Sequence, residues 1–184
     1  VATDHEKIYD ICVKWGIKVL MTSESHKTST DRVAEVATKL EADLYVEIMG
    51  DEPLIKPETI DAIVPDELED TFYVANLIAE ITDPTEVVDF TNLKCTVSEN
   101  GNAIAISRSP VPYPKASLEF SYKKLLGVCA FTKEALVFYS SNERGEIEKI
   151  EDNDFYRFLE RDKKVKLVEV KCKMLSVDTP KDLD

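Results

Sequence analysis

Short apolar segments alternate with amphipathic segments over the first fifty residues, and this alternation restricts the fold more than any other feature. Segments 1–4, 17–21 and 44–49 are short and apolar, as strands are, while 8–15 and 30–40 repeat apolar residues at helical spacing. Thr30 stands where it could cap the second helix. A strand, helix, strand, helix, strand order favours right-handed crossovers and a mostly parallel sheet between helices. The sequence therefore predicts an α/β fold.

The middle of the chain changes character. Asn100-Gly101 separates two apolar segments, and Asn-Gly favours the tight turn of an antiparallel hairpin. Pro57 and Thr132 are placed to begin helices. The remaining expected elements are a helix over 154–160, the hairpin strands 93–97 and 103–107, and strands over 72–81, 125–131, 165–170 and 174–177.

A chain of 184 residues fits one domain. We therefore expect residues 1–184 to form a single domain around one core. The first residue is not Met and begins inside an expected strand, and Asp184 closely follows the helix-starting Thr179-Pro180. We expect the domain to lack residues at both ends.

Charge and composition exclude several classes of partner. A net charge of -13 opposes binding to nucleic acid or anionic membranes, which requires clustered Lys and Arg. No stretch approaches the roughly 20 apolar residues that span a bilayer, and the start lacks the pattern of a signal peptide, so the cytoplasm is the expected compartment. The 4 cysteines form no C-x-x-C pair and there are only 2 histidines, so any metal must be held mainly by oxygen.

Two aspartates leave the ends of apolar segments in the same way. Asp51 follows 44–49 within Gly50-Asp51-Glu52-Pro53, and Asp178 follows a second short strand within Val177-Asp178-Thr179-Pro180. Ligands of open α/β sheets bind outside the carboxyl ends of strands. Mg²⁺ is commonly held by one or two carboxylates together with substrate phosphates. Asp51 and Asp178 are thus candidates for one metal site, although acids after strands are more often solvated turn or cap residues.

A longer pattern resembles the CMP-Kdo synthetase branch of the acylneuraminate cytidylyltransferase family over nearly the whole chain (Kdo is 3-deoxy-manno-octulosonate). Each block of the pattern is short, but together they follow the family order, which makes the match specific. They are Ala2-Thr3-Asp4-His5-Glu6, 21–26, Thr30-Asp31-Arg32-Val33-Ala34-Glu35-Val36, Gly50-Asp51-Glu52-Pro53, Ser107-Arg108-Ser109-Pro110-Val111-Pro112, Leu126-Gly127 and Val177-Asp178-Thr179-Pro180-Lys181-Asp182-Leu183.

The resemblance implies a Rossmann-like nucleotidyltransferase fold with a small antiparallel hairpin region. It also implies an enzyme that transfers CMP from CTP to an acidic keto-sugar and releases pyrophosphate, with Mg²⁺ on Asp51 and Asp178 as the catalytic pair. Thr30, Arg32 and Asp51 would bind the nucleotide. The implied sugar-binding residues are Met49, Arg108, Glu148, Glu151 and Asp154.

Several of these residues also have plainer interpretations. Arg32 could be a helix-surface charge, and Arg108 could hold down a proline-rich loop. Glu148, Glu151 and Asp154 could form a solvated acidic turn with helix N-terminal charge.

The sequence departs from the family pattern in three places. The family opens with a strand and a basic phosphate-binding loop that this sequence does not contain, so the site of this chain alone is expected to be incomplete. Met49 aligns with a glutamine and Leu125 with a histidine of the sugar pocket, and both changes remove hydrogen-bonding groups. The acceptor could then be another acidic sugar, such as a nonulosonic acid, or the chain could be a noncatalytic remnant. The family commonly forms homodimers, and the hairpin at Asn100 and Gly101 is the expected contact.

Overall fold

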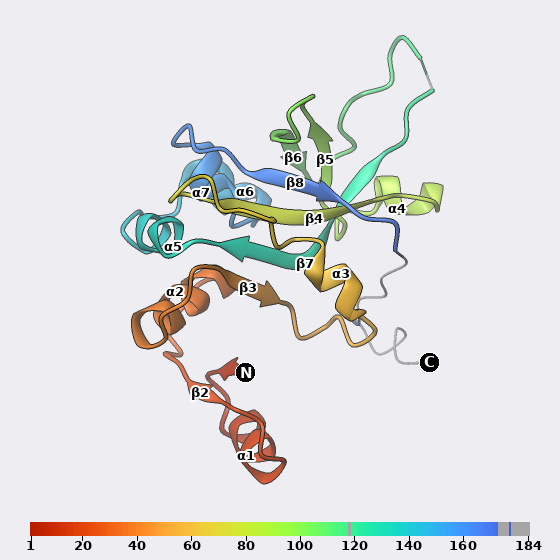
Figure 1. Cartoon of the computed structure of the whole chain (residues 1–184). Coiled ribbons are helices and arrows are strands. Elements are labelled where there is room, and N and C mark those ends of the chain that lie inside the picture. The colour runs from red at the N-terminus through yellow and green to blue at the C-terminus, as the bar shows by residue number, and fades with distance from the viewer. Residues whose placement is uncertain (118, 173–176, 178–184) are drawn as a thin grey trace.

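A computed structural model describes residues 1–117, 119–172 and 177 of the chain, and Figure 1 shows their arrangement. Its centre is a 6-stranded sheet in which the long strand β7 contacts three others. The strand order is β6-β5-β7-β4-β8, and β3 also pairs with β7. The strands are β3 (Tyr45–Ile48), β4 (Val74–Glu80), β5 (Lys94–Val97), β6 (Ala103–Ser107), β7 (Lys123–Phe131) and β8 (Lys166–Glu169).

The sheet is mixed. Strand β7 is antiparallel to β3, β4 and β5, whereas β4 and β8 are parallel. It follows that β3, β4, β5 and β8 run in one direction and β6 and β7 in the other. The predicted α/β class is confirmed. Strands that share a direction are often not direct neighbours, because β7 lies between β3 and β4.

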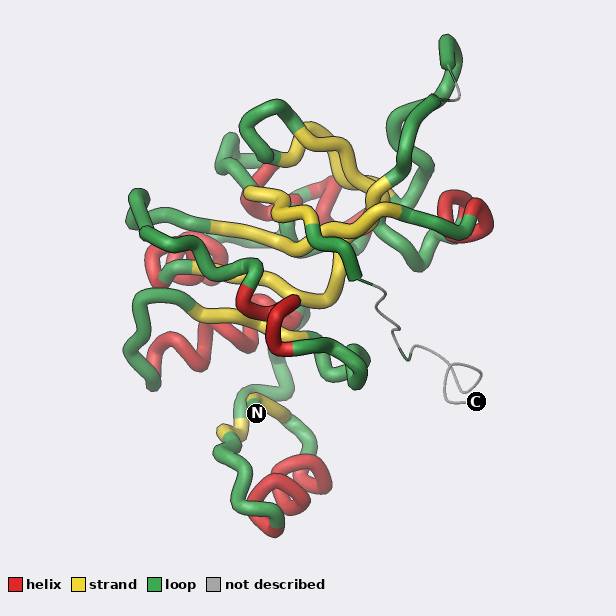
Figure 2. Tube along the Cα trace, turned by 45° about the vertical axis from the view of Figure 1, so that its right-hand side comes forward, coloured by secondary structure: helices red, strands yellow, loops and turns green. Residues whose placement is uncertain are grey.

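The first strands are placed differently from the prediction. Strands β1 (Ala2–Thr3) and β2 (Leu20–Met21) pair in parallel as a separate 2-stranded sheet, and helix α1 (Glu6–Lys14) connects them. Figures 1 and 2 show this unit below the large sheet, joined to it through α2 (Ser29–Lys39). A groove of about 720 Å³ is lined by residues of β1, α2 and β3. The predicted alternation of strands and helices is therefore correct. Among the described residues, however, the first two strands pair only with each other and not with the large sheet.

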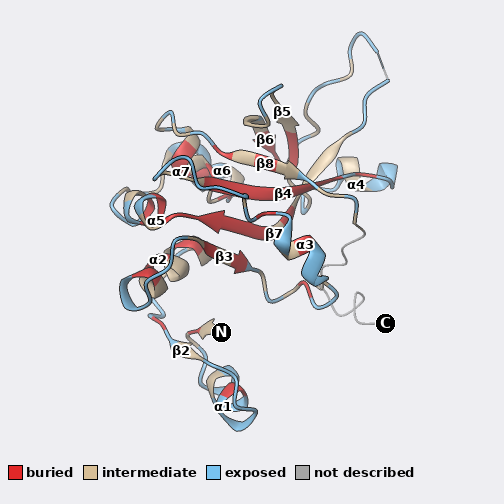
Figure 3. Ribbon diagram, viewed as in Figure 1, coloured by how far each residue is buried: buried red, intermediate tan, exposed pale blue. Residues whose placement is uncertain are grey.

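Helices cover the large sheet at one end. Helix α5 (Lys133–Ser140) packs against α2, and Phe158 of α7 (Tyr156–Leu159) meets the aromatic rings of Phe72, Phe131, Phe138 and Tyr139. Six consecutive residues of β4 are buried, and Figure 3 shows the buried stretches of β3, β4 and β7 side by side. Within the described residues, no helix is long and apolar enough to cross a membrane. The remaining helices are α3 (Pro57–Asp61), α4 (Pro84–Val88) and α6 (Glu146–Glu151).

Local signals set several element boundaries. The predicted hairpin forms between β5 and β6, and Gly101 turns the chain with φ +73°, a value that favours glycine. Thr132 stands at the predicted N-cap position of α5, but its side chain makes no capping hydrogen bond and instead accepts one from the Tyr73 N–H at 3.0 Å. The predicted capping role of Thr30 is wrong: Thr28 caps α2, its side chain accepting a hydrogen bond from the Asp31 N–H at 3.1 Å. The predicted strand over 174–177 falls mostly outside the described residues.

Candidate active site

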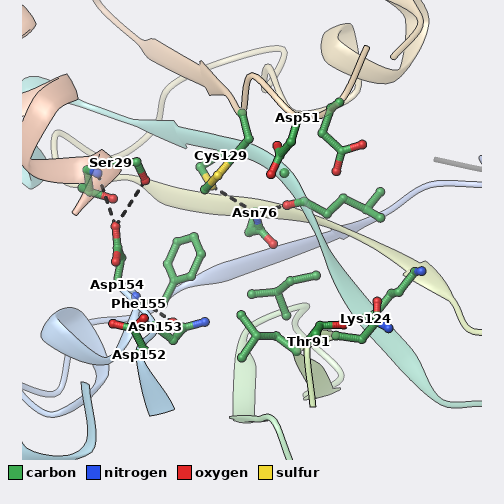
Figure 4. A pocket seen from close by; sticks show the side chains of 18 residues that line it. Ser29, Asp51, Asn76, Thr91, Lys124, Cys129, Asp152, Asn153, Asp154 and Phe155 are labelled. Carbon is green, nitrogen blue, oxygen red and sulfur yellow. Dashed lines mark hydrogen bonds between the residues drawn. The ribbon is translucent and has the colours of Figure 1, made fainter. Parts of the chain in front are cut away.

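A cavity of about 250 Å³ opens where β3 ends, beside β7 and the first turn of α2. Figure 4 shows its side chains, with Asp51 on one side, Ser29 and Asp154 on another, and Asn76 between them. The wall combines apolar side chains with a few polar groups, as ligand sites usually do. The lining residues are Ser29, Thr30, Met49, Asp51, Glu52, Asn76, Thr91, Asn92, Leu93, Lys124, Leu125, Leu126, Gly127, Cys129, Asp152, Asn153, Asp154 and Phe155.

Asp51 lies where the sequence predicted it. Strand β3 ends at Ile48, and Asp51 lines the cavity just beyond its carboxyl end. The backbone N–H of Val177 donates to the carbonyl oxygen of Asp51 at 2.8 Å. Asp178 follows Val177 in the sequence but lies outside the described residues. The two segments that carry the predicted metal ligands therefore meet at the backbone.

Gly127 on β7 lets the segment that follows β3 come close to β7 at the cavity wall. The backbone N–H of Met49 donates to the Gly127 carbonyl oxygen at 2.8 Å. A Cβ atom at residue 127 would lie 2.9 Å from Cγ of Glu52 and 3.1 Å from Cβ of Met49. A larger residue would push both side chains away, so the Leu126-Gly127 block has a steric reason here.

Asp154 joins the segment before α7 to the start of α2. Its carboxylate accepts hydrogen bonds from the Thr30 backbone N–H at 3.2 Å and from Ser29 Oγ at 3.5 Å. Burial raises the pKa of the Asp154 carboxyl, and the contacts with Thr30 partly oppose this rise. Two predicted residues, Thr30 and Asp154, are thus brought together although 124 positions separate them.

Glu47 lies behind the same wall, on β3, and lines the groove between β1 and β3. Its side chain is 9% exposed, and its Oε2 has no hydrogen-bond partner among the described residues. Burial raises the pKa of Glu47 to about 7, and the charge of Asp154 acts in the same direction. The nearby carboxylate of Asp154 therefore disfavours ionisation of Glu47.

Asn76 is a polar residue on the buried strand β4, with an exposed fraction of 1%. Its side-chain nitrogen donates to the carbonyl oxygens of Leu126 at 2.9 Å and Val128 at 2.8 Å. The Cys129 sulfur lies 3.1 Å from the same nitrogen. Burial raises the pKa of the Cys129 thiol well above its usual range, so this cysteine stays protonated.

Arg32 contacts protein groups rather than the cavity. Its guanidinium donates to Asp4 Oδ2 at 2.7 Å and to Thr22 Oγ1, which ties α2 to the unit of β1 and β2. It lines the groove between β1 and β3. Its predicted contact with a nucleotide stays a prediction.

Arg108 and Glu151 are bound to each other and to the backbone. Arg108 donates from Nε to the Glu151 carbonyl oxygen at 2.6 Å and from Nη1 to the Phe90 carbonyl oxygen at 3.0 Å. The Glu151 carboxylate accepts from Ser107 Oγ and from the Arg108 backbone N–H, each at 2.8 Å. Neither residue lines the cavity. These contacts agree with the plainer interpretation of Arg108 as a residue that holds a loop, and sugar binding by either residue remains a prediction.

Glu148 is fully buried in an ion-pair network. Its Oε1 lies 2.6 Å from Nη2 of Arg157 and 3.1 Å from Nε of Arg144. Arg157 also contacts Asp31 at 2.9 Å and stacks over the Tyr139 ring. The exposed fraction of Glu148 is 0%, and Glu148 does not line the cavity. Both observations disfavour its predicted contact with a sugar.

The sequence interpretation missed Asn76, Ser29, Cys129 and Phe155 as cavity residues. Asn76 carried a signal, because a lone amide in an apolar strand such as 72–81 must find partners when it is buried. Cys129 and Phe155 are residues of a kind that is equally common in cavities and in cores, and Ser29 lies in a polar segment where nothing distinguishes it from its neighbours.

The described part of the cavity suits Mg²⁺ only in part. Asp51 and Glu52 place carboxyl groups on its wall, and carboxylate oxygen is the ligand that Mg²⁺ prefers. Among the described residues, no group of three or more His, Cys, Asp or Glu side chains could hold a metal. A site made of one or two carboxylates with substrate phosphates does not require such a group.

Comparisons with known proteins agree with this geometry. The cytidylyltransferase family model matches residues 1–171. The 3-deoxy-manno-octulosonate cytidylyltransferase of Solibacter usitatus is 38% identical over 100% of this chain and 74% of its own length, and that of Escherichia coli is 29% identical over 100% and 75%. A CMP:2-keto-3-deoxy-manno-octonic acid synthetase solved in complex with CTP superposes with a TM-score of 0.91 at 31% identity, over 100% of this chain and 76% of that one.

A more distant structure shares the fold alone. The inositol-1-phosphate CTP transferase from T. maritima is 15% identical, with a TM-score of 0.68 over 100% of this chain and 70% of that one.

The family model and the relatives above 30% identity agree on one group of nucleotidyltransferase enzymes. The chain therefore belongs to the cytidylyltransferase family, in the branch of the CMP-Kdo synthetases.

Proposed function

We propose that this protein transfers CMP from CTP to Kdo or a closely similar 3-deoxy-2-keto acid sugar, with release of pyrophosphate. The observation that carries the proposal is Asp51, whose side chain lines a cavity just beyond the carboxyl end of β3. This is where α/β sheets bind ligands. The similarity to a synthetase solved with CTP supports the choice of nucleotide.

Asp51 and Asp178 are the proposed ligands of Mg²⁺. The hydrogen bond from the Val177 N–H to the Asp51 carbonyl oxygen supports this pairing, because Asp178 is the next residue in the sequence. When bound, the ion would offset the charge of the phosphates and orient them.

In the proposed reaction, the anomeric hydroxyl oxygen of the sugar bonds to the α-phosphorus, the bond from that phosphorus to pyrophosphate breaks, and the hydroxyl proton passes to solvent water. The chain's own contribution is mainly to position the reactants. The wall formed by Gly127, Met49 and Glu52 and the hydrogen-bonded pair of Asp154 and Thr30 come from distant parts of the chain, which favours a preformed site.

The test is pyrophosphate release from CTP and Kdo in the presence of Mg²⁺ by the natural protein and its Asp51→Asn variant. We expect the variant to lose at least about 100-fold in turnover, because it lacks a charge next to the reacting phosphates. Asp61→Asn makes the same change on α3, outside the cavity, and should keep activity. Circular dichroism should show both variants folded. Undiminished turnover by folded Asp51→Asn would remove Asp51 from the site.

A second candidate acceptor is another acidic sugar, such as a nonulosonic acid. The cavity wall favours it in one respect, because Met49, Leu93, Leu125 and Leu126 offer no hydrogen-bonding side chains. A panel of keto-acid sugars offered with CTP separates the candidates. Turnover of sialic-type acids without turnover of Kdo would replace the first proposal by the second.

We further infer that the product serves surface glycan or lipopolysaccharide synthesis in the cytoplasm and that the protein acts as a homodimer. Contacts within the chain limit which side of the hairpin could form the predicted dimer contact. Lys166 Nζ donates to the Asn100 carbonyl oxygen at 2.7 Å, and the Leu167 N–H donates to that of Gly101 at 2.8 Å, so this side of the turn is occupied within the chain. The exposed side chain of Ile104 on β6 remains open to a partner. Sedimentation of the natural protein would measure its mass in solution.

A further inference from the structure

We propose that Asn76 is a specificity-determining residue, whose side-chain oxygen accepts a hydrogen bond from a hydroxyl group of the acceptor sugar. The inference rests on the proposed function and adds a named contact to it. Asn76 lines the cavity, is 1% exposed, and its Oδ1 has no hydrogen-bond partner among the described residues. A buried acceptor without a partner costs free energy, so it calls for an explanation.

The orientation of the amide is fixed by chemistry. The Asn76 Nδ2 atom lies 2.9 Å from the carbonyl oxygen of Leu126 and 2.8 Å from that of Val128. Carbonyl oxygens only accept hydrogen bonds, so the NH₂ group must face them. A flipped amide would place oxygen against two oxygens. The Asn76 oxygen therefore faces away from β7, and Figure 4 shows it turned toward the middle of the cavity.

The NH₂ group has a structural task of its own. The pairing of β4 with β7 shifts between Asn76 and Ile78: Asn76 is opposite Cys129, and Ile78 is opposite Leu125. In this irregular stretch the carbonyl groups of β7 lose regular ladder partners, and the Asn76 NH₂ group serves two of them. This task explains the nitrogen but not the oxygen. A residue that only held the bulge would not need an acceptor directed at the cavity.

The surroundings select the kind of donor that the oxygen can bind. Asp51, Glu52, Asp152 and Asp154 all line the cavity, and Lys124 is the one cationic side chain among its described lining residues. Such a wall disfavours a phosphate or carboxylate next to Asn76 unless a cation accompanies it. A neutral hydroxyl group can donate to the amide oxygen without this cost. Sugars present several such groups, and a cavity of about 250 Å³ suits a ligand of their size better than a whole nucleotide.

The experiment compares Kdo with a set of derivatives that each lack one further hydroxyl group, using CTP and the natural protein. We expect one derivative to show kcat/KM about 10-fold below that of Kdo, the effect of one buried neutral hydrogen bond. In the Asn76→Leu variant, Kdo and this derivative should react equally well, because neither finds the acceptor. Cys129→Ala is the matched variant: it removes one contact of the Asn76 nitrogen but keeps the oxygen, and should keep the 10-fold ratio.

Three results would overturn the proposal. One is equal reactivity of all derivatives with the natural protein, which needs no variant to fold. Another is an unchanged ratio in Asn76→Leu. A third is a rise in the KM for CTP alone in that variant, which would assign the Asn76 oxygen to a donor on the nucleotide. Absence of pyrophosphate release with any keto-acid sugar would instead contradict the proposed function. In that case the contact is tested by the melting temperature of the natural protein, measured with Kdo and with each derivative. Equal shifts for all of them, or no shift, would contradict the contact between Asn76 and a sugar hydroxyl.

Discussion

The N-terminal unit and the large sheet use the same kinds of element in opposite ways. In α1, Ile8 and Ile11 are each 48% exposed, Trp15 at its C-cap is 70% exposed, and Cys12 is the one buried residue of this described helix. In β4, six consecutive residues are buried. The sequence pattern thus predicts the type of element in both regions, but only contact with other elements turns an apolar face into stability.

Two aromatic residues should separate the regions most strongly. Phe158 is fully buried among four aromatic rings, whereas Trp15 is largely exposed. We expect Phe158→Ala to lower the free energy of unfolding by about 3–5 kcal/mol, because it leaves a cavity in the core. Trp15→Ala should change it by less than about 0.5 kcal/mol. Urea denaturation measures both, and similar losses would show that α1 is covered in solution.

Two arginines make a second, electrostatic comparison. Removing Arg157 would leave Glu148 buried without its main partner, so Arg157→Leu should cost about 3–5 kcal/mol. Arg32 pairs with a partly exposed Asp4, and Arg32→Leu should cost at most about 1 kcal/mol. The same denaturation measurements apply. The comparison fails if Arg32→Leu costs as much as Arg157→Leu.

Glu47 gives the large sheet a dependence on pH. Its pKa of about 7 lies above the model-peptide value of 4.5, so the folded state binds the proton more tightly than the unfolded state does. The free energy of unfolding should therefore fall between pH 4.5 and about 7, by roughly 3 kcal/mol at most. Glu47→Gln should remove this fall, and be more stable than the natural protein at pH 8 but not at pH 4.

Glu35 of α2 is the control for this prediction. Contacts with Lys39, the Ser23 N–H and His26 lower its pKa to about 2, so its contribution is present above pH 4.5 and is lost as the pH falls toward 2. Glu35→Gln should thus change the slope below pH 4.5, where the carboxyl of the natural protein takes up its proton. A slope between pH 4.5 and about 7 that Glu47→Gln does not change would assign it to another group, with Asp154 the first to examine.

A smaller effect than those at Phe158, Arg157 and Glu47 is expected at the start of α2, where the two regions join. Thr28→Ala removes the cap of the Asp31 N–H and a 2.9 Å contact with the Tyr139 hydroxyl. We expect a loss of about 1 kcal/mol, the usual value for an N-cap. Thr30→Ala leaves this cap in place, and a larger effect of Thr30→Ala on stability would reverse the assignment of the cap. Thermal unfolding of the two variants makes this comparison.

Much of the local structure followed from the sequence. Periodicity predicted the order of strands and helices, Asn100-Gly101 predicted the hairpin, and the acids after 44–49 predicted where Asp51 would lie. These features depend on residues that are close in sequence, because a repeat of 2 or 3.6 residues and a turn dipeptide carry their own backbone preference.

The contacts across the molecule were decided by the tertiary structure. Asp154 meets Thr30, the Asn76 amide meets the irregular part of β7, and the Arg108 guanidinium bonds backbone carbonyl oxygens. The chemical type of a charged or amide residue shows which groups it can bind. It does not show which distant group will lie next to it in the fold. Which partner arrives depends on how the strands and helices pack, since that packing alone brings residues more than a hundred positions apart within hydrogen-bonding distance.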